Sequence, residues 1–220
     1  MATTKRKAAD ITVIRELDGF SKETVAQLKL AAAGVARTEL FEAAGAPIPR
    51  GVLLVGAHES DVGLAVRALA GASKLARATC GDAPLSAAVG KRIVHATPRA
   101  PAALIALLEE QTPGQTLLCA SWPKEEAVPE ELQDGFRIVE FGLPDEEGRM
   151  RMLKHRAKKM RLAEDVVLSD IAKKMEGMSA SKVFEACDAA ATRCVREHMD
   201  ADLDADGLAK VAVSAAHFVL

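Results

Sequence analysis

The chain has 220 residues, of which 49% are hydrophobic and 27% charged, so it can bury a substantial core. Its 29 basic and 31 acidic residues give a formal net charge of −2, which argues against a strongly basic nucleic-acid-binding protein and against an acidic disordered chain. Aromatic residues make up only 3%, with no tyrosine, which disfavours a surface that stacks on bases. The composition predicts a soluble globular protein.

The basic cluster at 5–7 favours a solvated tail, with a weak nuclear-targeting signal as the alternative. The basic cluster at 5–7 is not followed by an apolar stretch, so residues 1–17 are predicted to be a flexible tail rather than a secretory leader. No apolar run reaches the roughly 20 residues that span a bilayer. Four cysteines lack the spacing of metal ligands and are expected to be buried, reduced thiols, which favours the cytoplasm, with the nucleus as an alternative. They are Cys80, Cys119, Cys187 and Cys194.

Strands and helices are predicted to alternate along residues 18–143. The continuous apolar run 51–56 is typical of a strand covered on both faces of a parallel sheet. Segment 63–70 has helical spacing, and the Ala/Leu/Glu content of 101–110 favours a second helix. Further strands are predicted at 75–80, 92–97, 115–121 and 136–141. The alternation predicts an α/β domain with a parallel sheet.

After Pro144 only helices are predicted. The first covers 145–160, and the second covers 168–175 and ends at Gly177. Ser179 is placed to cap a third, which runs to about 199, and a fourth covers 206–217. Residues 144–220 are therefore predicted to form a small helical domain.

Three stretches of the sequence occur in an order that is specific to one family. Residues 39–54 lead into the position of a nucleotide loop, 136–149 connect the last strand to the helical part, and 158–177 supply helices of that part. Together they resemble the AAA+ ATPases, and most closely the regulatory ATPases of the proteasome and the archaeal proteasome-activating nucleotidase. The resemblance implies a P-loop-NTPase-like parallel-sheet domain followed by an all-helical lid domain.

The family binds phosphate with a loop of pattern GxxxxGK[ST], which supplies backbone N–H groups, a lysine and a magnesium-binding hydroxyl. Here Asp61 stands at the second glycine, Val62 at the lysine and Gly63 at the hydroxyl, and Glu59 adds another carboxylate. Negative charge at the place of the phosphates repels them, so we expect weak or no triphosphate binding. This vestigial nucleotide loop consists of Gly56, Ala57, His58, Glu59, Ser60, Asp61, Val62 and Gly63.

The acids that would hold magnesium and activate water should follow the third strand, but segment 91–97 contains neither Asp nor Glu. An alternative is that 105–110 is an apolar strand ending in Glu109 and Glu110. The scarcity of β-branched residues and the closeness of the next strand favour a helix there.

Other parts of the family's machinery are also altered. The segment of the polar sensor reads Ala120-Ser121-Trp122-Pro123, and the arginine-finger segment is reduced to 133–136. Arg156 stands at the position where the family has a histidine in its lid domain. The pore loop, usually aromatic, aliphatic and glycine, corresponds to Ala88, Val89 and Gly90 and lacks the aromatic residue.

The C-terminus is compared with the family's docking motif, a hydrophobic residue, a tyrosine and any residue. Phe218 matches the first position, Val219 replaces the tyrosine, and Leu220 is last. The end is a candidate for docking on a proteasome core particle, with a helix end packed on the lid as the alternative. The basic run from 149 to 161 is interpreted mainly as a solvated helix, with an acidic partner surface as the alternative.

The leading hypothesis is a non-catalytic AAA+-like protein, a pseudo-ATPase, that acts as a binding, structural or regulatory subunit. Expected partners are related AAA+ ATPase subunits or a second copy, and neither nucleic acid nor a membrane. No catalytic residue, metal or cofactor is expected. The alternative is an ATP-hydrolysing unfoldase subunit that uses Mg-ATP, with Lys91 or the Glu109–Glu110 pair replacing missing groups. A third alternative is a relic without function.

Overall fold

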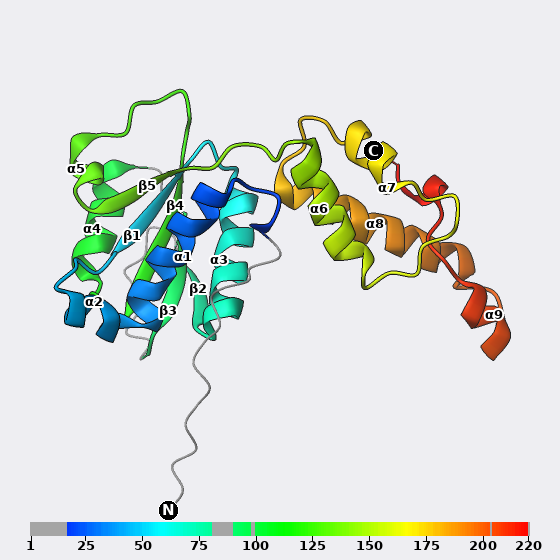
Figure 1. Ribbon diagram of the computed structural model, residues 1–220, viewed down its shortest axis with the longest axis horizontal. Helices are drawn as coiled ribbons and strands as arrows, with labels where there is room; N and C mark the ends of the chain where they lie inside the picture. The colour runs from blue at the N-terminus through cyan, green and yellow to red at the C-terminus, as the bar shows by residue number, and fades with distance from the viewer. Residues whose placement is uncertain (1–16, 81–89, 98–99, 203, 220) are drawn as a thin grey trace, which may run out of the picture. The chain divides into compact units, whose positions relative to one another are not determined.

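The computed structural model describes residues 17–80, 90–97, 100–202 and 204–219. The chain forms two compact units (Figure 1). Ser21–Gly142 belongs to the first unit, and Arg15–Phe20 groups with Leu143–Leu220 in the second. The sequence placed 18–20 in the first domain. Residues 17–20 group with the second unit because Leu17 is fully buried and the side chain of Arg151 donates to the carbonyl of Asp18 (2.8 Å).

The first unit contains a five-stranded parallel sheet. The strands are β1 (Gly51–Val55), β2 (Ala76–Cys80), β3 (Arg92–Ala96), β4 (Thr116–Trp122) and β5 (Phe136–Glu140), in the order β2-β3-β4-β1-β5. In the central register Val52 lies opposite Cys119 of β4 and Arg137 of β5. β1, the fully apolar strand, is in the interior of the sheet, as the sequence predicts. This arrangement is consistent with a P-loop-NTPase-like α/β domain.

Helices cover the sheet. They are α1 (Lys22–Ala36), α2 (Thr38–Ala44), α3 (Glu59–Ser73), α4 (Pro101–Glu110) and α5 (Glu130–Gln133). α1 and α3 pack on each other and on the sheet, while α4 and α5 form an apolar cluster with Leu53, Leu118 and Phe136. α4 has the predicted bounds, with Pro101 in its first turn. The alternative strand at 105–110 is therefore wrong, and Glu109 and Glu110 end a helix.

The second unit is helical, with α6 (Glu146–Ala157), α7 (Leu168–Lys174), α8 (Ala180–His198), α9 (Ala205–Lys210) and the 3-10 turn η2 (Ala215–His217). α6 packs on α7 and α8 (Figure 1). The side chain of Asp145 caps α6 by accepting from the N–H of Gly148 (2.6 Å). Ser179 stands at the N-cap of α8, but its side chain makes no capping bond and lies 3.1 Å from the hydroxyl of Ser181.

The basic run at 149–161 is mainly solvated, as predicted, with one exception: Arg149 is buried and donates to the carbonyls of Ala172 (2.8 Å) and Pro144 (3.0 Å). The prediction of one helix over 206–217 is wrong, because the chain is interrupted between α9 and η2, where Val213 pairs with Leu162 in an isolated parallel bridge. Within the described residues, no helix is both long and apolar enough to cross a membrane.

Candidate functional site

The vestigial nucleotide loop lies at the carboxyl end of β1, the edge of a parallel sheet where ligands usually bind. Gly56 has a φ of +84° and donates its N–H to the carbonyl of Trp122 (2.8 Å). A Cβ at Gly56 would lie 3.6 Å from the carbonyl oxygen of Phe141 and 3.6 Å from the Cβ of Lys124. The loop therefore begins between the ends of β4 and β5.

Most of the vestigial loop is helical. α3 begins at Glu59, so only Gly56, Ala57 and His58 connect β1 to the helix. The sequence predicted this helix only from residue 63. The difference arises because Glu59 and Asp61 are in the first turn, where acidic side chains interact favourably with the helix dipole. Because residues 56–63 were compared with a phosphate-binding loop, these acidic residues were not recognised as the start of a helix.

The first turn of α3 uses its backbone donors within the chain. The N–H groups of Asp61 and Val62 both donate to the carbonyl of His58, at 2.9 and 3.1 Å. Val62, at the position of the phosphate-binding lysine, is fully buried in the apolar core. Asp61 is also buried, at 4% exposure. The described backbone thus directs the residue at the lysine position into the core.

His95 on β3 faces this turn. Its Nδ1 lies 3.8 Å from where a Cβ at Gly63 would be, and its Nε2 is buried without a hydrogen-bond partner among the described residues. Burial lowers the pKa of His95, and the negative charge of Glu59 opposes this shift. The imidazole is therefore held mainly neutral near pH 7.

The groups that the ATPase alternative would need lie at the other edge of the sheet. Lys91 precedes β3, and its ammonium donates to the hydroxyl of Thr38 (3.1 Å). Glu109 and Glu110 end α4, next to Gln111, whose amide donates to the carbonyl of Arg50 (2.9 Å) just before β1. The five residues of β1 separate this edge from Gly56 by roughly 16 Å. None of these side chains is placed to act on a ligand at Gly56.

Sequence reasoning missed one basic residue. Lys124 follows β4 by two residues, and its Cβ and Cδ lie 3.6 and 3.8 Å from the Cβ position of Gly56. The signal was available, because neighbouring parallel strands end at the same edge and each is followed by residues that meet there. Lys124 is thus a basic side chain that the structure, within its described residues, places beside the vestigial loop.

The other altered positions have structural partners. Trp122, at the sensor segment, is buried and donates its indole N–H to the carbonyl of Glu126 (3.1 Å). In the arginine-finger segment, the amide of Gln133 donates to the carbonyl of Val128 (2.7 Å). Arg156 of the lid donates its Nε–H to Asp188 (2.8 Å).

The last two predicted sites lie only partly within the described residues. Gly90 of the pore loop is exposed with a φ of +119°, while Ala88 and Val89 lie outside the described residues. Phe218 packs against a small apolar cluster that includes Cys194 and Val213. Val219 is 64% exposed, and Leu220 lies outside the described residues.

The cysteines of the described residues are free thiols and all four are buried, as predicted. Burial raises the pKa of Cys119 to about 12 and that of Cys187 to about 11. Thiols of such high pKa are poor nucleophiles at neutral pH. Among the described residues no group of three His, Cys, Asp or Glu side chains is arranged to hold a metal ion.

Known proteins match this chain over part of its length, and two of them show the similarity. The chain is 44% identical over 64 residues to a "Proteasome-activating nucleotidase" of Methanocaldococcus jannaschii. The matched stretch covers 29% of this chain and 15% of that protein. It is 41% identical over 69 residues to a "Putative cell division cycle ATPase" of Plasmodium falciparum. This stretch covers 31% of this chain and 6% of that protein. The chain is related to AAA+ ATPases. No protein-family model matches this AAA+-like chain, and the matched stretches span only a small part of both relatives.

Proposed function

We propose that this AAA+-like protein is a non-catalytic subunit, a pseudo-ATPase with a binding, structural or regulatory role. The observation that carries the proposal is the early start of α3 at Glu59, which places Val62 in the core where the family pattern needs a phosphate-binding lysine. A connection of three residues does not enclose a phosphate group with backbone N–H donors.

Charge at the site supports the same proposal. Glu59 and Asp61 bring two carboxylates to the first turn of α3, and among the described residues the end of β4 brings Lys124 close to Gly56. Phosphate groups are repelled by nearby carboxylates. We therefore expect no cofactor to bind in the manner of the family.

The competing function is an ATP-binding and ATP-hydrolysing subunit of a proteasomal unfoldase. It is favoured by the relationship to AAA+ ATPases and by the position of Lys124 over Gly56. It is opposed by the distant positions of Lys91 and the Glu109–Glu110 pair, which were its candidate replacements. We rank it second on this ground.

Related AAA+ ATPase subunits, or a second copy of this chain, are the proposed partners. The basis is the similarity to a protein named for activating the proteasome, and this extends the proposal to an assembly of the proteasomal type, including docking on a core particle through residues 218–220. Surfaces that hold subunits together depend on apolar area, so they persist when phosphate-binding residues are lost. The proposed location is the cytoplasm, with the nucleus as the alternative.

The first experiment compares the thermal midpoint with and without millimolar Mg-ATP. A ligand at about 100 times its Kd stabilises a protein by roughly 2.7 kcal/mol, which corresponds to several degrees for a chain of this size. We expect no shift. A shift that disappears in Lys124→Ala but persists in the control Lys91→Ala would instead support the competing function.

The second experiment tests the partner. Purified protein is mixed with a recombinant proteasome-activating ATPase, and the masses of the complexes are measured by light scattering after size-exclusion chromatography. Co-migration with the ATPase supports a subunit role. A protein that runs alone under all nucleotide conditions, and that shows no self-association, contradicts it.

A further inference from the structure

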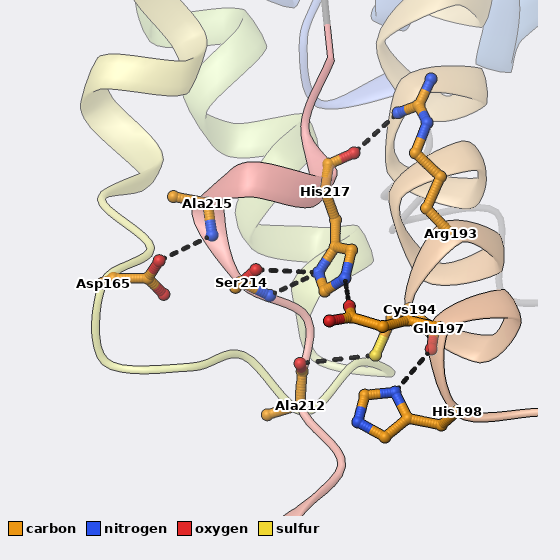
Figure 2. A network of polar contacts seen from close by, with 9 residues as sticks. All are labelled: Asp165, Arg193, Cys194, Glu197, His198, Ala212, Ser214, Ala215 and His217. Carbon is orange, nitrogen blue, oxygen red and sulfur yellow. Dashed lines mark hydrogen bonds and ion pairs between the residues drawn. The ribbon is translucent and has the colours of Figure 1, made fainter. Parts of the chain in front are cut away.

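The C-terminal segment, residues 211–219, is attached to α8 by side-chain contacts (Figure 2). The guanidinium of Arg193 donates to the carbonyl of His217 (2.7 Å), and a carboxylate oxygen of Glu197 lies 2.6 Å from Nε2 of His217. The thiol of Cys194 donates to the carbonyl of Ala212 (3.4 Å). Three side chains within five positions of α8 therefore hold the segment.

A second set of contacts joins the segment to the turn that follows α6. The N–H of Val213 donates to the carbonyl of Arg161 (2.8 Å), and the N–H of Ala163 donates to the carbonyl of Val213 (2.9 Å). The carboxylate of Asp165 accepts from the N–H of Ala215 (3.0 Å), as Figure 2 shows. The segment thus occupies a binding site formed by α8 and residues 161–165.

Ser214, His217 and Glu197 lie in a row that has the appearance of a hydrolytic triad. The hydroxyl of Ser214 is 3.0 Å from Nδ1 of His217, but the N–H of Ser214 donates to the same Nδ1 at 2.9 Å. Nδ1 is therefore unprotonated, its lone pair is occupied by the backbone, and Nε2 carries the proton that it donates to Glu197. The arrangement is a capping box that fixes the segment, not an activated serine.

The chain between α8 and this segment is held much less firmly. Among the described side chains of α9 none is buried, and Leu208 is 60% exposed. Val195, in the last turn of α8, and Met199, at its C-cap, are 63% and 67% exposed. The side chain of Arg161 donates to two backbone carbonyls of α9, those of Leu208 (3.2 Å) and Ala209, and the carboxylate of Asp204 caps the helix. The connection therefore differs from the bound segment in the burial of its side chains.

We propose that the site formed by α8 and residues 161–165 accepts the C-terminal segment of a second copy, so that two chains exchange residues 211–219. Every contact that holds the segment can be made equally by the same residues of another chain, and no described side chain of the connecting helix α9 is buried. Exchange of an identical element is a low-cost route to a dimer. The inference is independent of nucleotide binding and of the proposed function.

The test uses a disulfide between residues that touch across the site. Ala212→Cys places a second thiol beside Cys194. Wild type supplies Cys194, and the double variant Cys194→Ala/Ala212→Cys supplies the other thiol, so neither chain alone can form this bond. The two proteins, one with a mass tag, are mixed at high concentration, warmed, oxidised mildly and analysed on a non-reducing gel. Exchange predicts a covalent heterodimer.

A matched control carries the new thiol on the same segment but away from Cys194, at the exposed position 216 (Cys194→Ala/Ala216→Cys). We expect no heterodimer from it. A heterodimer with both variants overturns the proposal. It is also overturned if the Ala212→Cys pair gives no heterodimer while single Ala212→Cys closes a bond within its own chain.

If Ala212→Cys forms neither bond, light scattering of the wild type decides. A monomer at all concentrations overturns the proposal. A concentration-dependent dimer that is weakened by Glu197→Ala/Arg193→Ala supports it.

Discussion

Replacement of Val62 by lysine tests whether this position belongs to the apolar core or to a phosphate-binding site. Val62 is fully buried, so the introduced amine either enters the core or forces α3 to move. Keeping a lysine neutral at pH 7, more than three units below its usual pKa of about 10.4, costs about 4.6 kcal/mol at about 1.36 kcal/mol per unit. At roughly 2–4 °C per kcal/mol for a chain of this size, the midpoint of the first unit should fall by about 9–18 °C.

The assay follows thermal unfolding by the fluorescence of the single tryptophan. Trp122 is buried in the first unit, so its emission reports that unit separately from the helical one. Val62→Ala is the matched control, and it should cost about 1.6 kcal/mol from the loss of two buried methyl groups, plus a cavity term.

A buried lysine also has a pH signature. Its pKa in the folded state is below that in the unfolded state, so the unfolded state binds more protons and stability rises with pH. Between pH 7 and 9 the Val62→Lys variant should recover up to about 2.7 kcal/mol relative to the wild type. A Val62→Lys protein as stable as the wild type, or one that gains Mg-ATP binding, would refute the assignment of Val62 to the core and with it the main support for a non-catalytic role.

Three further predictions concern other buried groups. Arg149→Met should destabilise the helical unit by about 2–4 kcal/mol in a circular-dichroism melt, because two buried carbonyls lose their donor, whereas exposed Lys154→Met should change it by less than about 0.5 kcal/mol. Burial lowers the pKa of His95 in the folded state, so its protonation favours unfolding: stability should fall as the pH drops below about 6.5, and His95→Gln should flatten this slope in urea titrations followed by tryptophan fluorescence. An unchanged slope would contradict that role. Because the pKa values of Cys119 and Cys187 are raised to about 12 and about 11, a thiol reagent at pH 8 should label them at the rate of unfolding; fast labelling of the native protein would contradict their burial.

Strands β1 and β4 could be predicted from the sequence because they are short, mostly apolar runs, and α4 because Ala and Leu dominate it. The start of α3 could not, since Glu59 and Asp61 were interpreted through the spacing of a phosphate loop rather than as favourable residues of a first helical turn. In the same region, Lys124 became visible only when the parallel neighbours of β1 were known. Local patterns identified most helices and strands. The comparison with a phosphate loop, which suggested the function, led to the wrong start of α3.

The second unit shows the effect of contacts between distant residues. The apolar spacing of 206–217 continues as in a helix, yet Val213 pairs with Leu162 about fifty positions away and breaks it. A run of basic residues likewise gives no sign that Arg149 differs from its neighbours, because its partners, the carbonyls of Pro144 and Ala172, come from outside α6. Such pairings are set by packing, which periodicity does not report.

The fold and the altered loop are connected physically. The sheet is held by apolar side chains on both of its faces, and none of this packing requires a phosphate-binding loop. Val62 contributes to that core, so the change that removes the lysine position also anchors the first turn of α3. To regain a phosphate cradle, the chain would need to unwind this turn, release the N–H groups that bond to His58, and remove Asp61 from the interior. A single substitution does none of these, so the backbone, and not only the identity of one residue, supports a role in binding rather than catalysis.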